Sequence, residues 1–362
     1  LFIMKKNFLF WVTLLLTITG VFSSCGEEEI LETKVEIGES VMVDINNTTF
    51  EFTYTSENTV ELTSKKIEYD NYVHIVIPEK VKINAKEFIV NGIGKSVFRN
   101  CSRLESIEIP SSVTYIGSYA FYDCSSLTDI EIPANVTRIE EFTFRGCQKL
   151  KNIKIPSSVT SIEESAFHFC FMLNDFDLPS SLDSIGVCAF YDCHNLTNIK
   201  IPSSVTYIGE DAFTNCKGLI NVEIPSSVTM IGEGAFSRCE NLTSIEIPSS
   251  VTFIGDYVFY ECENLSSIKL PSTITSIGNY AFYKCNKLES IEIPSMVVSI
   301  GKDAFYECGE LTSVKIPASV TFIGKNAFIR CEKADIVIDN SEANVTVEEY
   351  AFSACKSVTW EK

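Results

Sequence analysis

Cysteine is the residue type whose number and spacing in this sequence most suggest chemistry. Eleven of the 14 cysteines recur at intervals of 23 residues, and a phenylalanine stands three residues before each of them. In secreted proteins many cysteines usually indicate disulfide bonds, and thiolates are also good ligands for zinc. The recurring cysteines are Cys101, Cys124, Cys147, Cys170, Cys193, Cys216, Cys239, Cys262, Cys285, Cys308 and Cys331.

The regular spacing favours a third interpretation, a ladder of buried free thiols. A fixed period places each cysteine at the same position of successive repeats, so a disulfide would have to choose arbitrarily between two identical neighbours. The spacing of about 4.8 Å between strands nevertheless permits a bridge, and scattered disulfides stay the alternative. Metal binding needs close cysteine pairs or recurring histidines, and the sequence has neither. We therefore predict a structural cysteine ladder, whose members act as small apolar residues, and no metal site.

Other chemistry finds little support in the sequence. The histidines are His74, His168 and His194, at unrelated positions of the repeat. No H-E-x-x-H, G-x-S-x-G or phosphate-binding glycine loop is present. We therefore expect no enzymatic activity and no cofactor. The formal net charge of −19 repels phosphate backbones, which argues against nucleic acid as a partner.

Two short segments of each repeat alternate apolar and polar residues, as β-strands do. In one repeat these segments are residues 242–247 and 251–254, separated by Pro248, which has no N–H to extend a strand ladder. We expect Gly255 to adopt a backbone angle that only glycine accepts easily, before a tight or 3-10-like turn carries Phe259 inward. One such repeat cannot bury its apolar side alone. The period therefore predicts a β-rich solenoid of stacked coils.

The repeat pattern C-x-x-L-x-x-I-x-I-P-x-x-V-x-x-I-G-x-x-A-F-x-x-C resembles the BspA-like (Treponema pallidum type) leucine-rich repeats. The resemblance covers about Tyr72 to Cys355. It implies a leucine-rich-repeat solenoid, of about 12 coils by the number of repeats. Ahead of the repeats, the alternation in Phe50-Glu51-Phe52-Thr53-Tyr54 indicates an N-terminal β cap. The resemblance also implies an adhesin-like protein of the cell surface, which binds host matrix proteins, plasma proteins or other microbial surface proteins.

The start of the chain predicts export. Met4-Lys5-Lys6 precedes a short apolar stretch, as in a signal peptide. Ser23-Ser24-Cys25-Gly26 resembles a bacterial lipobox, and the following Glu27-Glu28-Glu29 resembles the surface-export tag of Bacteroidetes lipoproteins. These resemblances imply a lipid on Cys25 as the single membrane contact, in an outer-membrane lipoprotein exposed at the cell surface. Cleavage by an ordinary signal peptidase is the alternative.

We divide the chain into five segments on these grounds. They are a signal peptide (1–24), a lipidated tether (25–49), an N-terminal cap with a first degenerate repeat (50–100), regular repeats (101–331) and a degenerate C-terminal capping repeat (332–362).

Exposed aromatic residues are the candidates for partner binding. A predicted tyrosine patch lies around the phenylalanine turn of three successive repeats and should stack: Tyr257, Tyr260, Tyr280, Tyr283 and Tyr306. A second predicted stripe precedes the Ile-Gly pair of three repeats: Tyr207, Met230 and Phe253. Tyrosine provides contact area at low entropic cost, although stacked rings also stabilise neighbouring coils without binding anything. The outward strand position mixes acidic and basic residues from Glu108 to Lys315, and only two of its nine steps put like charges side by side, which indicates a solvated scaffold face.

Three functional hypotheses follow. The first is an adhesin-like protein that binds another protein. The second is a glycan-binding surface lipoprotein for nutrient capture, which only the tyrosine patch supports. The third is a structural spacer of the cell envelope with no specific ligand.

Overall fold

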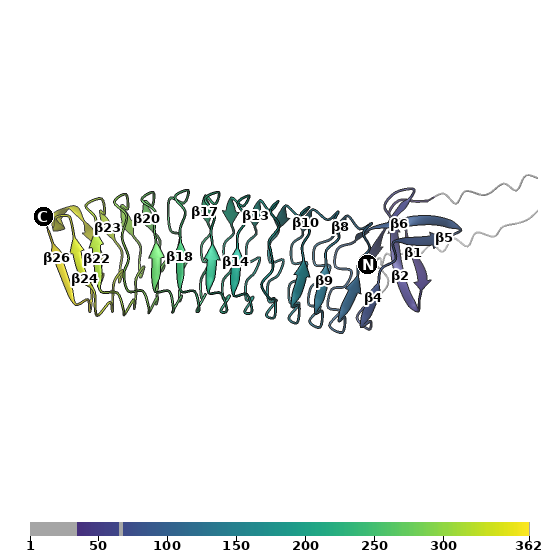
Figure 1. The fold of residues 1–362 in the computed structure, drawn as a ribbon, viewed down its shortest axis with the longest axis horizontal. Coiled ribbons are helices and arrows are strands. Elements are labelled where there is room, and N and C mark those ends of the chain that lie inside the picture. The colour runs from purple at the N-terminus through teal and green to yellow at the C-terminus, as the bar shows by residue number, and fades with distance from the viewer. Residues whose placement is uncertain (1–34, 65–67, 362) are drawn as a thin grey trace, which may run out of the picture. The chain divides into compact units, whose positions relative to one another are not determined.

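The described residues fold into stacked β-coils behind an N-terminal β cap. The computed structural model describes residues 35–64 and 68–361, so the predicted signal peptide and Cys25 lie outside the described residues. Figure 1 shows the coils one behind another between the cap strands and the C-terminal end. There are about 12 coils with a period of about 23 residues, which confirms the predicted leucine-rich-repeat solenoid.

The first strand of most coils pairs in parallel with its equivalent in the next coil, about 23 residues away. Ser244 lies opposite Ser267, for example, and Ile245 opposite Ile268. Only the middle residue of these short strands is buried, as the alternating pattern predicts. This first column contains β4 (His74–Val76), β7 (Ser106–Glu108), β9 (Asp129–Glu131), β11 (Asn152–Lys154), β14 (Asn198–Lys200), β16 (Asn221–Glu223), β18 (Ser244–Glu246), β19 (Ser267–Lys269), β22 (Ser313–Ile316), β24 (Asp335–Ile338) and β26 (Ser357–Trp360).

The second strand of each coil is shorter and forms a second parallel column. Its two residues pair with the next coil, and the isoleucine is buried. In the repeat that served for the prediction this strand is reduced to a single bridge between Ile254 and Ile277. The column contains β8 (Tyr115–Ile116), β10 (Arg138–Ile139), β12 (Ser161–Ile162), β13 (Ser184–Ile185), β15 (Tyr207–Ile208), β17 (Met230–Ile231), β20 (Ser276–Ile277), β21 (Ser299–Ile300), β23 (Phe322–Ile323) and β25 (Thr346–Val347).

A turn around the core phenylalanine closes each coil, and its backbone differs from the prediction for Gly255. The residues two before and two after the phenylalanine have positive φ, as at Tyr257 (59°) and Glu261 (54°). Gly255 does not, so that prediction is wrong. Glycine serves instead to let backbones approach, because a Cβ on Gly232 would lie 2.4 Å from the Glu210 nitrogen. We call the row of these five-residue turns the turn edge.

Backbone hydrogen bonds join the turn edge of one coil to the next. The amides of Tyr257, Phe259 and Glu261 donate to carbonyls of the following coil over 2.7–2.9 Å. These bonds use no side-chain atom, so most side chains can occupy the outward positions. The turn edge is therefore a regular frame whose outward side chains vary from coil to coil.

The core consists of columns of identical side chains. Phenylalanine rings stack from coil to coil; Phe213, for example, lies 5.3 Å from Phe190 and 5.5 Å from Phe236 between ring centroids. The column starts at Tyr69 of the cap, whose ring lies 5.2 Å from Phe98. Such close packing of buried aromatic rings makes each coil depend on its neighbours.

The N-terminal cap begins earlier than predicted. Its sheet has the order β1-β2-β3-β6-β5, and β6 also pairs with β8, which joins the cap to the second column. Because β1 pairs with β2 in six antiparallel positions, residues 40–49 belong to the cap and not to the tether predicted over 25–49. The cap strands are β1 (Ser40–Ile45), β2 (Thr48–Tyr54), β3 (Thr59–Thr63), β5 (Lys80–Ile83) and β6 (Lys86–Ile93).

The last coil departs from the repeat, as its sequence does. A short 3-10 helix, η1 (Glu342–Asn344), stands between β24 and β25. Phe352 continues the aromatic column at 5.8 Å from Phe328, and Cys355 reaches the Phe328 carbonyl at 3.2 Å despite coming one residue late. The segment 332–361 therefore stacks on the regular repeats and ends the first column with β26.

Candidate functional site

The structure buries the cysteine ladder in the core as free thiols. All eleven predicted ladder cysteines are at most 1% exposed and unbridged. From Cys124 onward each thiol donates to the carbonyl oxygen of the phenylalanine 26 residues earlier, over 3.0–3.3 Å. Burial raises the pKa of the ladder thiols from Cys124 to Cys331, to about 12 at Cys262. Such thiols carry almost no thiolate at neutral pH and are therefore poor nucleophiles.

Cys188 and Cys355 are the part-exposed cysteines of the described residues. Burial, followed by the nearby carboxylates of Asp211 and Glu164, raises the pKa of Cys188 to about 11. Burial alone raises the pKa of Cys355 to about 11. Neither thiol has the electropositive surroundings that activate a cysteine nucleophile. No group of three or more histidine, cysteine or acidic residues within the described part of the chain is arranged to hold a metal ion.

The tyrosine patch forms two stacked columns on the turn edge. Tyr257 stacks on Tyr280 at 4.8 Å, and Tyr283 lies between Tyr260 and Tyr306 at 4.9 and 4.6 Å. Tyr257 is 41% exposed, whereas the other four are half-buried because the rings cover one another. Loss of water contact, followed by the neighbouring tyrosines, raises the pKa of Tyr283 to about 12. The patch is thus a neutral, fixed aromatic surface.

The second predicted stripe lies on the second strand column. Tyr207 and Met230 are paired neighbours in β15 and β17, and Phe253 follows at the equivalent place of the next coil. Met230 is 45% and Phe253 38% exposed, but no ring of this stripe stacks on another within the described residues. The structure therefore places the stripe apart from the tyrosine patch, in a different column.

A second aromatic group, near the N-terminal end of the turn edge, was missed from the sequence. Tyr119 stacks on Phe142 at 4.8 Å and lies 5.7 Å from Tyr122. The Arg145 guanidinium lies 5.6 Å from the Tyr122 ring and 5.7 Å from the Phe142 ring. Tyr119 and Phe142 occupy the same repeat position as Tyr257, which was the signal available in the sequence.

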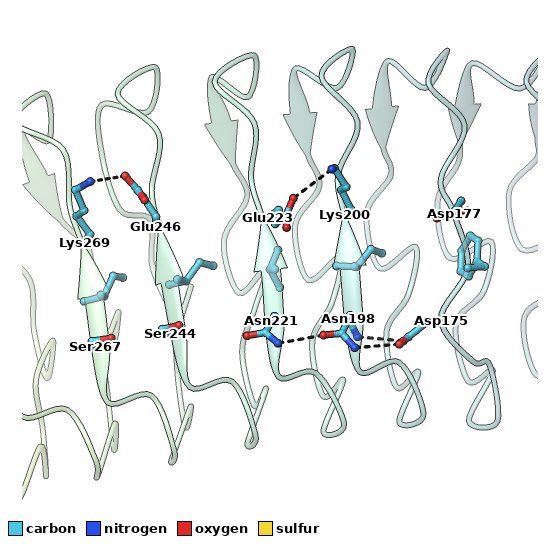
Figure 2. A pocket seen from close by; sticks show the side chains of 15 residues that line it. Asp175, Asp177, Asn198, Lys200, Asn221, Glu223, Ser244, Glu246, Ser267 and Lys269 are labelled. Atoms are coloured by element: carbon cyan, nitrogen blue, oxygen red, sulfur yellow. Dashed lines mark hydrogen bonds and ion pairs between the residues drawn. The ribbon is translucent and has the colours of Figure 1, made fainter.

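A groove of about 850 Å³ follows the first strand column over β14, β16, β18 and β19. Figure 2 shows two polar rows along it, with buried aliphatic residues between them. In one row Asn221 donates to Asn198 over 3.1 Å, and Asn198 donates to Asp175 over 3.2 Å (Figure 2). The other row holds ion pairs between neighbouring coils: Lys200 with Glu223 at 3.6 Å and Lys269 with Glu246 at 2.5 Å (Figure 2).

One coil interrupts the strands at the end of this groove. Residues 175–177 form no strand, and Phe176 stands where other coils have isoleucine or valine. Its half-buried ring lies 6.4 Å from Phe167 and 6.0 Å from Phe190. Asp175 accepts hydrogen bonds from the backbone amides and side chains of Thr197 and Asn198. Burial alone would raise the pKa of Asp175, but these hydrogen bonds together outweigh burial and lower it. The groove's polar groups therefore mostly satisfy one another.

Comparison with known proteins identifies the repeats. The sequence model of the BspA type leucine rich repeat region matches in six copies, over residues 22–140, 67–194, 114–242, 170–283 and 229–359. None of the curated proteins matches the chain. No helix among the described residues is both long and apolar enough to cross a membrane.

Solved bacterial structures share the fold. A leucine-rich repeat protein from Bacteroides ovatus is 30% identical, with a TM-score of 0.67, over 85% of this chain and 79% of that one. A leucine rich cell surface protein from Faecalibacterium prausnitzii is also 30% identical, with a TM-score of 0.53, over 84% of this chain and 96% of that one. On the repeats and on these matches, the chain belongs to the BspA type leucine-rich repeat family.

Proposed function

We propose that this protein is an adhesin-like binding protein of the cell surface, and that it recognises another protein through the tyrosine patch. Leucine-rich repeat proteins generally bind other proteins. The observation that carries the proposal is the two stacked columns of tyrosine rings, held on a frame of backbone hydrogen bonds. Rings that are already ordered lose little entropy when a partner covers them, which is why tyrosine is enriched in binding hot spots.

The sheet groove is the other candidate binding surface, and its chemistry supports binding less well. Its charged and amide groups already pair with one another across the coils. A partner would have to replace these pairs with pairs of its own, and the exchange gains little because an exposed ion pair of either kind contributes only about 0.2–1 kcal/mol. We therefore place the binding surface on the turn edge and treat the groove as scaffold.

We further propose export and a lipid anchor on Cys25, on the strength of residues 4–29 of the sequence. The F. prausnitzii relative is described as a cell surface protein, which supports the location. Changing Cys25→Ser should release the protein from the membrane fraction into the soluble one. Retention of the Cys25→Ser protein in membranes would show that another element anchors the chain.

Glycan binding is the second candidate, because flat tyrosine rings are also a stacking surface for sugars. The chain from Gly26 onward contains every described residue and suits both tests. We would screen it against a panel of matrix and plasma proteins and against a glycan array. A protein hit supports the first proposal, a glycan hit replaces it with the second, and binding to neither favours an envelope spacer.

Variants connect any hit to the patch. Tyr260→Ala with Tyr283→Ala should weaken binding about tenfold or more, because both rings lie in the stacked column. Lys200→Ala with Lys269→Ala in the sheet groove is the matched control and should leave affinity within about twofold. If the groove variant loses affinity and the tyrosine variant does not, the proposed surface is wrong.

A further inference from the structure

A hollow of about 450 Å³ opens on the turn edge where the aromatic columns are interrupted. Thr214 and Ser237 stand at the repeat position that tyrosine occupies in the neighbouring coils, and Gly234 stands at the position of Tyr257. Tyr191 lines the hollow on one side, and Tyr257 lines it on the other, beside the tyrosine patch. The hollow therefore exists because three small residues replace larger ones between two aromatic walls.

Three carboxylates line this hollow without a cation to neutralise them. Glu210, Asp211 and Glu233 make no ion pair within the described residues, and the one hydrogen bond to their side chains is from the Thr214 hydroxyl to Asp211, over 2.8 Å. Arg238 also lines the hollow, but its guanidinium is 3.2 Å from Glu261. The hollow thus carries an excess of negative charge.

Two of the three rings that line the hollow differ from the others on the turn edge, whereas the third, Tyr260, has the Arg238 guanidinium 5.8 Å from its ring centroid. Elsewhere on this edge the protein's own cations lie over aromatic rings, such as Lys302 over Tyr280 at 5.3 Å and Arg330 over Tyr306 at 5.9 Å. Among the described residues, no lysine or arginine lies over the rings of Tyr191 and Tyr257. Both rings without a cation belong to the hollow.

Ser237 adds an unused polar group. The residue is 7% exposed and lines the hollow, yet its hydroxyl makes no hydrogen bond to any described residue. The equivalent hydroxyl of Thr214 does have partners, Asp211 at 2.8 Å and the Gly234 carbonyl at 2.6 Å. This hydroxyl opens on the hollow, so its oxygen can accept a hydrogen bond from an N–H donor of a ligand.

We propose that this hollow binds a lysine or arginine side chain of the partner protein. The proposal rests on the proposed protein-binding function and adds the chemistry of the partner. The ammonium or guanidinium group donates to Glu210, Asp211 and Glu233 and to the Ser237 hydroxyl. The charged head or its alkyl stem covers the free faces of Tyr191 and Tyr257, as cations do over other rings of this edge.

The test uses a 12-residue synthetic peptide with a central Arg-Lys pair and, as its neutral counterpart, the same peptide with citrulline and acetyl-lysine. We expect the chain from Gly26 onward to bind the basic peptide about tenfold more tightly than the neutral one, by surface plasmon resonance. Glu210→Gln, Asp211→Asn and Glu233→Gln together should remove most of that difference. Ser237→Tyr should also remove it by filling the hollow, and should fold because tyrosine occupies that position in other coils.

A charge-matched control separates the hollow from general attraction to an acidic protein. Glu108→Gln, Asp177→Asn and Glu292→Gln change the net charge equally, on the first strand column, where these residues make no ion pair in the described chain. This control should keep the preference for the basic peptide. Equal losses in both triple variants, or no preference at all, would overturn the proposal. A natural partner whose affinity depends on Tyr283 and Tyr306, which do not line the hollow, but not on its three carboxylates would overturn it while leaving the proposed function intact.

Discussion

The protection of the cysteine ladder can be tested by adding a thiol reagent to the folded protein. The eleven ladder thiols are at most 1% exposed, and those from Cys124 onward donate to a backbone carbonyl, so a reagent can reach them only when coils separate. Cys188 and Cys355 are part-exposed and accessible to a reagent in the folded chain. We therefore expect two slow sites and eleven protected ones.

The rate at the two accessible sites follows from their pKa values. A thiol with the ordinary pKa of 9.0 is about 10% thiolate at pH 8, whereas a pKa of about 11 leaves about 0.1%. Because the thiolate is the reacting species, Cys188 and Cys355 should react about 100-fold more slowly than an unperturbed thiol. The shifts are directed upward, so their rates should still be rising steeply with pH at pH 10.

Iodoacetamide labelling followed by peptide mass spectrometry measures each site separately. In the chain from Gly26 onward, which lacks Cys25, Cys188→Ala with Cys355→Ala should abolish labelling of the native protein, and guanidinium should then reveal the full ladder. The test also separates free thiols from the disulfide alternative, because a bridged pair stays unlabelled in guanidinium until it is reduced. Rapid labelling of several ladder cysteines in native protein, or any mapped bridge between them, would refute the reasoning.

Three further predictions concern stability, and urea unfolding measures each of them. Phe213→Ala should lower the free energy of unfolding by about 3–5 kcal/mol, because its fully buried ring packs between two others. Gly232→Ala should lower the free energy of unfolding by about 1–3 kcal/mol, because the new Cβ would lie 2.4 Å from a backbone atom. Gly255→Ala is the control, since the atom nearest to its new Cβ is 3.5 Å away, and it should change stability by less than about 1 kcal/mol. Equal losses in the two variants would contradict the close-approach explanation. Burial and then Arg145 lower the pKa of His168 from 6.5 to about 4, so between these pH values only the unfolded chain takes up the proton and stability falls as pH falls. Because His168 is partly exposed, we expect the free energy of unfolding to fall by only about 1–2 kcal/mol over this pH range. The His168→Tyr variant should not show this fall, and an unchanged pH dependence in that variant would exclude His168 as the cause.

The repeat architecture could be predicted because its signals are local and periodic. Each buried position recurs every 23 residues, so a repeat whose sequence is ambiguous can be interpreted from the other repeats. The N-terminal cap has no such redundancy. Its first strand, Ser40–Ile45, has a half-buried alternation that appears only once, and the predicted boundary therefore fell too late.

The backbone of the turn edge could not be predicted from residue types. Glycine was expected to mark the positive φ angle, yet tyrosine and glutamate adopt it at Tyr257 and Glu261. Stacking with the neighbouring coils imposes this conformation and overrides the preference of these residue types for negative φ. The hollow was missed for a related reason, since Thr214, Gly234 and Ser237 are conspicuous only when three coils are compared side by side.

The two faces of the coils differ in how much their side chains depend on one another, and this difference is why we propose that the turn edge binds the partner. On the first strand column, a charged residue such as Glu246 has its partner, Lys269, in the next coil, so a change at one position disturbs another. On the turn edge the coils are joined by backbone bonds, and the side chain at a position such as Ser237 is free to differ from Tyr260 without loss of those bonds. A surface whose coils stay joined by backbone hydrogen bonds, whatever its outward side chains, can vary from coil to coil. The aromatic walls and the acidic hollow between them are variation of this kind, on a frame kept constant by the phenylalanine column and the cysteine ladder.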